Sequence, residues 1–266
     1  MSSDSTKKTI IVALGVCLVC SVFVATATVS LTPRQNENKK LDKIQNILLA
    51  GDIDYSKGNP EEIYFDRIKS AIVEIETGKF ITEYNDMLNP DSYDMKKLLG
   101  NPDYSAKIAP DKDLAGIKIK PKYMIIYEVM SKTKEVEKYI LPIYGKGLWS
   151  TMYGFIALDK DLSKVKGFTF YQHGETPGLG GEVDNPKWKE IWKNKEVFDA
   201  NGNPVIQVIK GRVDDTDPNA IHKIDGLSGS TLTTRGVDNT VKFWLGDEGY
   251  GPFFKRVKSE VNDEKI

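Results

Sequence analysis

The chain has 266 residues, with 37 basic and 38 acidic side chains and a formal net charge of −1. Apolar residues make up 40% of it and charged residues 28%, a balance that excludes wholesale disorder and allows a sizeable core. The near-neutral charge provides no basic face for phosphates, so we expect no nucleic-acid partner.

An uncharged apolar run extends from Thr9 to Leu31, between Lys7-Lys8 and Arg34. A helix needs about 20 apolar residues to cross a bilayer, whereas the apolar part of a signal peptide has about 7–15. Length therefore favours a retained transmembrane helix over residues 9–31. Because the tail of residues 1–8 is so short, we expect it to stay in the cytoplasm and the rest of the chain to be exported. The alternative is a signal peptide cleaved near Ala25-Thr26-Ala27.

Both cysteines, Cys17 and Cys20, lie inside this apolar run, where cysteine is usually a small packing residue. The exported part therefore has no disulfide, no thiolate nucleophile and no sulfur ligand. Its only histidines are His173 and His222, which excludes the usual zinc sites.

The region after the apolar run is predicted to be helical and irregular. Residues 32–40 are polar and contain Pro33, so we expect a linker that ends the first helix there. Apolar spacing predicts helices over Leu41–Ala50 and Pro60–Ile75, and residues 86–112 are typical of irregular loops. We expect residues 41–115 to form the N-terminal part of the exported domain.

Strand signals dominate from Lys122, within a second part that we expect to extend from residue 116 to residue 266. Four β-rich runs at hairpin spacing predict a meander over 122–130, 135–144, 151–158 and 164–172. Asn185-Pro186 is a typical helix start, residues 203–213 are predicted to form a strand, and a helix is expected from near Arg235. Strands in series with helices at both ends indicate an α+β fold with a mainly antiparallel sheet.

Several familiar motifs are approached but not matched. Gly145–Ser150 (GKGLWS) lacks the third glycine of a dinucleotide fingerprint and precedes a strand. Gly226–Ser230 (GLSGS) is close to a hydrolase elbow, but no histidine follows it in the chain. The Asp/Asn-rich stretches at 199–203 and 215–219 lack the glycine that a calcium loop needs at its sixth position.

Two segments have no obvious packing role: His173–Gly181 (HGETPGLGG) and Asp225–Thr234 (DGLSGSTLTT). They are either loops with helix-capping residues or an anion site. Glycines let backbone N–H groups approach a phosphate, and hydroxyl groups at a helix N-terminus add donors where the helix dipole is positive.

These two segments resemble the FMN-binding domain family. DGLSGST resembles its flavinylation motif, in which the last threonine carries FMN through a phosphoester bond. The resemblance implies that Thr231 is the acceptor, with Ser230 in place of the usual alanine. It implies further cofactor contacts from the matching positions Ser228, Gly229, Ser230, Thr233, Glu175, Thr176, Gly178, Leu179, Gly180, Trp149, Ser150 and Lys210.

Within that family the chain resembles the C subunits of the Na+-translocating NADH:quinone reductases. The resemblance implies a covalent FMN that relays electrons between NADH and quinone, coupled to Na+ export. The implied partners are the other subunits of the complex, the bacterial inner membrane, with the main domain on its periplasmic side, and a flavin transferase during maturation. Two alternatives are the G subunit of an Rnf-type electron-transport complex and an extracytoplasmic binding module without a redox role.

Overall fold

A computed structural model describes residues 5–263 of the chain, with side chains up to Glu260. Of the expected tail, residues 1–4 therefore lie outside the described residues. The chain divides into two compact units between Lys43 and Ile44. Residues 41–115 and 116–266 do not separate in this division, because nearly all of both belong to the second unit.

The first helix, α1 (Thr6–Ala50), contains the apolar run and is long and apolar enough to cross a membrane. The apolar side chains of that run, such as Leu14 and Phe23, are exposed. The expectation that Pro33 ends this helix is wrong, because Pro33 lies inside α1 and residues 32–40 are helical. Proline removes one backbone donor, and the neighbouring hydrogen bonds are enough to continue the helix through it.

The second unit is built on a five-stranded antiparallel sheet with the order β1-β4-β5-β6-β7. This confirms the predicted meander and the α+β class. The strand bounds are β1 (Ile68–Glu74), β4 (Tyr123–Met130), β5 (Val136–Lys146), β6 (Thr151–Asp159) and β7 (Val165–Gln172).

Strand β1 replaces half of a predicted helix. The helix expected over 60–75 stops as α2 (Pro60–Arg67), and the next residues pair with β4, Ala71 opposite Ile126. Its β-branched residues, such as Ile72 and Val73, suit a pleated surface that is buried on both faces. Ile68, Ala71 and Ile72 also recur at the spacing of one face of a helix, so periodicity alone does not separate the two structures.

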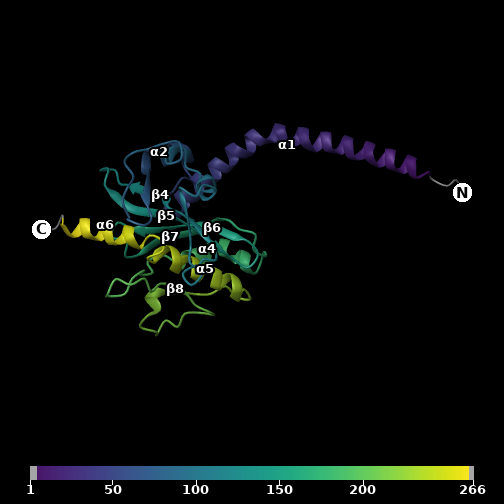
Figure 1. Cartoon of the computed structure of the whole chain (residues 1–266). Helices are drawn as coiled ribbons and strands as arrows, with labels where there is room; N and C mark the ends of the chain where they lie inside the picture. The colour runs from purple at the N-terminus through teal and green to yellow at the C-terminus, as the bar shows by residue number, and fades with distance from the viewer. Residues whose placement is uncertain (1–4, 264–266) are drawn as a thin grey trace. The chain divides into compact units, whose positions relative to one another are not determined.

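Each face of the sheet has its own core. On one face Ile125, Tyr127 and Ile140 pack with the last turns of α1, from Ile44 to Ala50. On the other face, Met124, Ile126 and Leu141 pack with α5 (Thr231–Leu245) and α6 (Gly251–Asp263). Figure 1 shows α2 on one side of the sheet, with α5 and the β8 segment on the opposite side.

The remaining elements are short. The strand expected over 203–213 is wrong except for β8 (Gln207–Val208), which pairs with β9 (Lys223–Ile224). The Asp238 carboxylate, at 2.9 Å, accepts the Val208 N–H in place of a further strand. The others are η1 (Pro90–Ser92), α3 (Met95–Leu99), β2 (Ser105–Lys107), β3 (Ile119–Pro121), η2 (Gly180–Asp184), α4 (Pro186–Glu190) and η3 (Ala220–His222).

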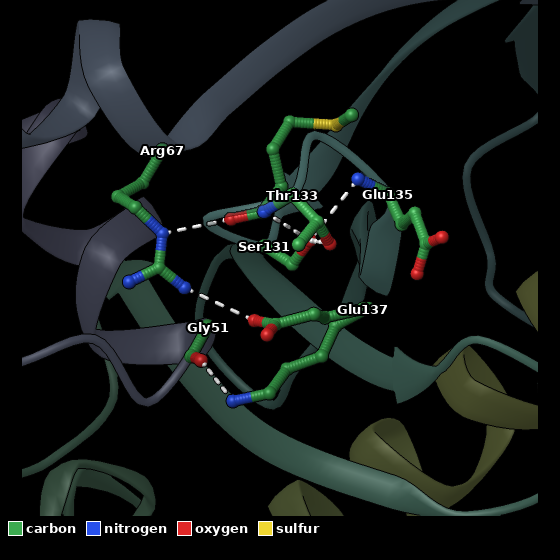
Figure 2. A network of polar contacts seen from close by, with 8 residues as sticks. Gly51, Arg67, Ser131, Thr133, Glu135 and Glu137 are labelled. Atoms are coloured by element: carbon green, nitrogen blue, oxygen red, sulfur yellow. Dashed lines mark hydrogen bonds and ion pairs between the residues drawn. The ribbon is translucent and has the colours of Figure 1, made fainter.

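A polar network fastens the end of α1 and the end of α2 to the β4–β5 hairpin (Figure 2). Arg67 donates to the Met130 carbonyl at 2.8 Å and to the Glu137 carboxylate at 3.0 Å. Lys138 donates to the Gly51 carbonyl at 2.7 Å, directly after α1 ends. The turn itself is closed by the Ser131 hydroxyl, which accepts the Thr133 and Glu135 N–H groups.

Helix α5 lies unusually close to the end of β5. A Cβ added at Gly236 would lie 2.5 Å from the Lys146 carbonyl oxygen and 3.1 Å from the Gly147 Cα. Only glycine allows this approach, which places the first turn of α5 against the loop that follows β5.

We therefore expect Gly236→Ala to destabilise the second unit by about 1–3 kcal/mol, because the added methyl group must push α5 away from a backbone carbonyl. Urea unfolding of the full chain in detergent, followed by tryptophan fluorescence, measures this free energy. Arg235→Ala, at the exposed neighbouring position, is the control. Equal unfolding free energies for the two variants would contradict the packing argument.

Candidate functional site

A cavity of about 370 Å³ lies where three segments meet beside the N-terminus of α5. This volume is within the range of small-molecule sites, about 300–1,000 Å³. The segments are the β5–β6 loop, the glycine-rich loop after β7, and the turn that begins α5. The lining residues are Leu148, Trp149, Glu175, Thr176, Leu179, Gly180, Gly229, Ser230, Thr231, Leu232 and Thr233.

Helix α5 presents free backbone donors to this cavity. It begins at Thr231, four residues earlier than predicted, and its N-cap residue Ser230 makes no side-chain cap. Within residues 5–263, no acceptor is found for the N–H groups of Thr231, Leu232 or Thr233. Three N–H groups at the positive end of a 15-residue helix suit a phosphate.

The three threonines at the start of α5 are in different environments. Thr234 is buried, and its hydroxyl accepts the Leu227 N–H at 3.0 Å. Thr233 is buried, and its hydroxyl donates to Glu175 at 2.6 Å. Thr231 is exposed, and its hydroxyl makes no hydrogen bond within the described part of the chain. Of the three hydroxyl groups, the Thr231 hydroxyl is therefore the one that is free to react.

Glu175 joins two walls of the cavity through a buried carboxylate that is 5% exposed. It accepts N–H groups from Leu148 at 3.2 Å, Trp149 at 3.0 Å and Ser150 at 3.3 Å, besides the Thr233 hydroxyl. Burial pushes the pKa of this carboxyl upward, but the four hydrogen bonds outweigh burial and hold the pKa below its ordinary value.

The loop that carries Glu175 is itself held in place by side chains. The Glu175 N–H donates to His173 Nδ1 at 3.2 Å, so the proton of the neutral imidazole is on Nε2, which lies 2.7 Å from the Asp184 carboxylate. The Gly174 N–H donates to the Ser150 hydroxyl at 2.6 Å. The loop after β7 and the β5–β6 loop are thus joined by side-chain and backbone contacts in both directions.

Comparison with known proteins gives the cavity a family. The FMN-binding domain family matches residues 147–246, which include every lining residue. The chain is 45% identical to the C subunit of the Na(+)-translocating NADH-quinone reductase of Pseudomonas aeruginosa, over 97% of this chain and 98% of that protein. It is 42% identical to the corresponding protein of Yersinia pestis, over 97% and 95%.

The chain belongs to the NqrC family, the C subunits of Na(+)-translocating NADH-quinone reductases. Solved structures agree. The NqrC of Shewanella oneidensis is 34% identical, with a TM-score of 0.74 over 83% of this chain and 99% of that one. The corresponding protein of Parabacteroides distasonis is 26% identical, with a TM-score of 0.64 over 84% and 96%. The match favours the NqrC family over the Rnf-type and binding-module alternatives.

The residues present fit FMN as the cofactor of this NqrC-family chain. Four large apolar side chains around the cavity are exposed to solvent: Trp149 at 67%, Leu232 at 54%, Leu179 at 45% and Leu148 at 41%. Exposed apolar groups gathered around one cavity indicate a ligand with an apolar face. The isoalloxazine ring of FMN supplies that apolar face, and the N–H donors at the N-terminus of α5 suit the phosphate of FMN.

Four predicted cofactor residues are not among those that line the cavity. Ser150 binds Gly174 and Glu175 instead, and Gly178 forms a turn with a φ of 74°. Ser228 and Lys210 lie outside the cavity lining as well. Lys210 belongs to a turn held by the hydrogen bond from the Gly226 N–H to the Gly211 carbonyl, at 2.8 Å.

Leu148 and Leu232 also line the cavity, and Asp225 has a structural part; none of the three was predicted. The Asp225 carboxylate accepts the Val213 N–H at 2.8 Å, and its carbonyl accepts the Trp188 indole N–H at 2.8 Å. Asp225 thereby holds the turn before α5 in place. The signal for the leucines was their position next to Trp149 and Thr231.

The lowered pKa of Glu175 predicts a pH-dependent stability. Below the ordinary carboxyl pKa of 4.5, the unfolded chain binds a proton that the folded chain still excludes, so stability is lost as the pH falls. We expect the free-energy advantage of the wild type over Glu175→Gln to be full near pH 7 and to shrink below pH 4.5. Urea unfolding at a series of pH values measures this, and an advantage that does not change with pH would contradict the lowered pKa.

Proposed function

We propose that this chain carries FMN covalently, through a phosphoester to the Thr231 hydroxyl, and relays electrons as a membrane-anchored subunit of a Na+-translocating NADH:quinone reductase. The observation that carries this proposal is the free, exposed Thr231 hydroxyl at the uncapped N-terminus of α5. The match to the FMN-binding domain family over residues 147–246 supports the identity of the cofactor.

Different residues of the chain would bind the phosphate and the ring of FMN. The backbone N–H groups of Thr231, Leu232 and Thr233 would hold the phosphate, whose charge the helix dipole favours. Trp149, Leu148 and Leu179 would form an apolar wall for the ring. The bound flavin supplies the electron-transfer chemistry that amino-acid side chains lack.

Attachment of the flavin depends on a second protein. A threonine hydroxyl is a weak nucleophile at neutral pH, and within the described residues no base is hydrogen-bonded to the Thr231 hydroxyl. We propose that a flavin transferase, with FAD as donor, supplies both the activated phosphate and the base: the pyrophosphate bond of FAD breaks, AMP leaves, and the Thr231 oxygen, which loses its proton to the base, forms the phosphoester. Thr231 is then a tether and not a catalytic residue.

The proposed cellular location rests on α1. We propose that residues 9–31 cross the bacterial inner membrane once and that the second unit lies on the periplasmic side. The exposed apolar side chains of this part of α1 support insertion into lipid. The other subunits of the complex are the proposed electron partners.

Thr231→Ala tests the attachment site. The wild-type chain, co-produced with a flavin transferase, is expected to gain the mass of one FMN less one water, and Thr231→Ala is expected to gain nothing while it stays folded. Intact-mass spectrometry measures both. Thr216→Ala, which removes an exposed threonine outside the cavity lining, should keep the adduct. A full adduct on Thr231→Ala would overturn the site, and no adduct on the wild type would favour a binding module.

Cysteine labelling tests the orientation, because the chain has no cysteine outside the apolar run. A membrane-impermeant maleimide, applied to cells with a permeabilised outer membrane, should label Ser56→Cys. It should label Ser5→Cys only after the inner membrane is broken. The reverse pattern would place the second unit in the cytoplasm.

A further inference from the structure

Glu175 has no free acceptor position for a ligand. A carboxylate has about four lone-pair positions, and the chain fills all four of them. Oε1 accepts the N–H groups of Trp149 and Ser150, and Oε2 accepts the Leu148 N–H and the Thr233 hydroxyl. Glu175 therefore lines the cavity without an oxygen to offer the cofactor, in contrast to the cofactor contact that resemblance implies.

The four donors come from two different segments of the chain. Three are consecutive N–H groups of the four-residue loop between β5 and β6, which carries Trp149. The fourth, the Thr233 hydroxyl, also accepts from Ser230 at 2.9 Å, and these two residues flank Thr231. One carboxylate therefore holds the apolar wall and the tethering residue in a fixed relation.

Two glycines make room for this carboxylate. A Cβ at Gly147 would lie 2.5 Å from Glu175 Oε1, and a Cβ at Gly180 would lie 2.5 Å from the Thr233 hydroxyl oxygen and 3.0 Å from Glu175 Oε2. The β5–β6 loop and the loop after β7 therefore both pack closely against the Glu175 side chain and its partner Thr233.

No ion pair in the described part of the chain includes Glu175, so the negative charge of this carboxylate has no cationic partner there. Its four donors are dipoles, which stabilise the ionised form but leave a net negative charge at the cavity. A buried negative charge opposes the arrival of further negative charge nearby, and more strongly so in a medium of low dielectric constant.

We propose that Glu175 is a positioning residue: it holds the β5–β6 loop, which carries Trp149, and the start of α5 in place before the cofactor binds. Its negative charge also lowers the reduction potential of the bound FMN. The first part concerns the chain alone. The second part rests on the proposed function, and the two parts are tested separately.

Hydrogen exchange on the full chain in detergent, produced without a flavin transferase, tests the first part. We expect Glu175→Ala to raise the exchange rates of the Leu148, Trp149 and Ser150 N–H groups about tenfold or more, while paired amides of β5 and β6 stay protected. Glu182→Gln removes a charge from the same loop region without touching the β5–β6 loop, and should leave these rates unchanged. Wild-type rates in Glu175→Ala would overturn the positioning role.

Glu175→Gln keeps the test open if the alanine variant does not fold. The glutamine Oε1 can still accept from Trp149 and Ser150, but its NH2 group, in the place of Oε2, can accept neither the Leu148 N–H nor the Thr233 hydroxyl. We therefore expect faster exchange at Leu148 alone, by about tenfold or more. Unchanged exchange at Leu148 would contradict the assignment. Because no flavin is present, a failure of the proposed function leaves this result interpretable.

Redox titration of the FMN-loaded chain tests the second part. We expect the midpoint potential of Glu175→Gln to be more positive than that of the wild type and of Glu182→Gln, because a charge that opposes reduction has been removed. An equal or more negative potential in Glu175→Gln would overturn this part. A wild-type chain that takes up no FMN would refute the proposed function instead, and intact mass identifies that case.

Discussion

The Glu175 carboxylate and its four donors are the contact on which the cavity depends. Without it, the β5–β6 loop would have three unpaired N–H groups, and Thr233 would have no acceptor for its hydroxyl. Each buried polar group left unpaired costs roughly 1–3 kcal/mol of folding free energy. These groups would therefore form hydrogen bonds to water instead, and the two segments that Glu175 joins would separate. The apolar wall and the uncapped N-terminus of α5 keep their relative positions because the Glu175 carboxylate between them is fully hydrogen-bonded to donors of the chain.

The sheet brings these distant parts of the sequence together. Strand β6 is antiparallel to both β5 and β7, so the loop before β6 and the loop after β7 lie at the same end of the strands. Helix α5 reaches that end of the sheet because Gly236 lets it approach the end of β5. Loops and a helix end that are far apart in the sequence thus form one site on a rigid framework.

Part of this arrangement follows from sequence alone. The four strands of the meander and the Asn185 cap of α4 were predictable because their patterns are local. Strand β1 (Ile68–Glu74) was not predictable, because the spacing of its apolar residues fits both a helix and a strand until β4 is known as its partner. The loops at 173–181 and 225–234 could be singled out by their resemblance to the FMN-binding domain family, and parts of both line the cavity. That the Thr233 hydroxyl and the Glu175 carboxylate are occupied by each other depends on a contact across 58 positions, which no local pattern contains.

Exposure and position at the helix end select Thr231 from a motif with several hydroxyl groups. Proteolysis of the FMN-loaded wild-type chain, followed by fragmentation of the peptide over residues 225–235, locates the adduct directly. We expect the whole adduct on Thr231. An adduct on Ser230, Thr233 or Thr234, whose side chains are buried, would contradict it, and so would one on Ser228, which does not line the cavity.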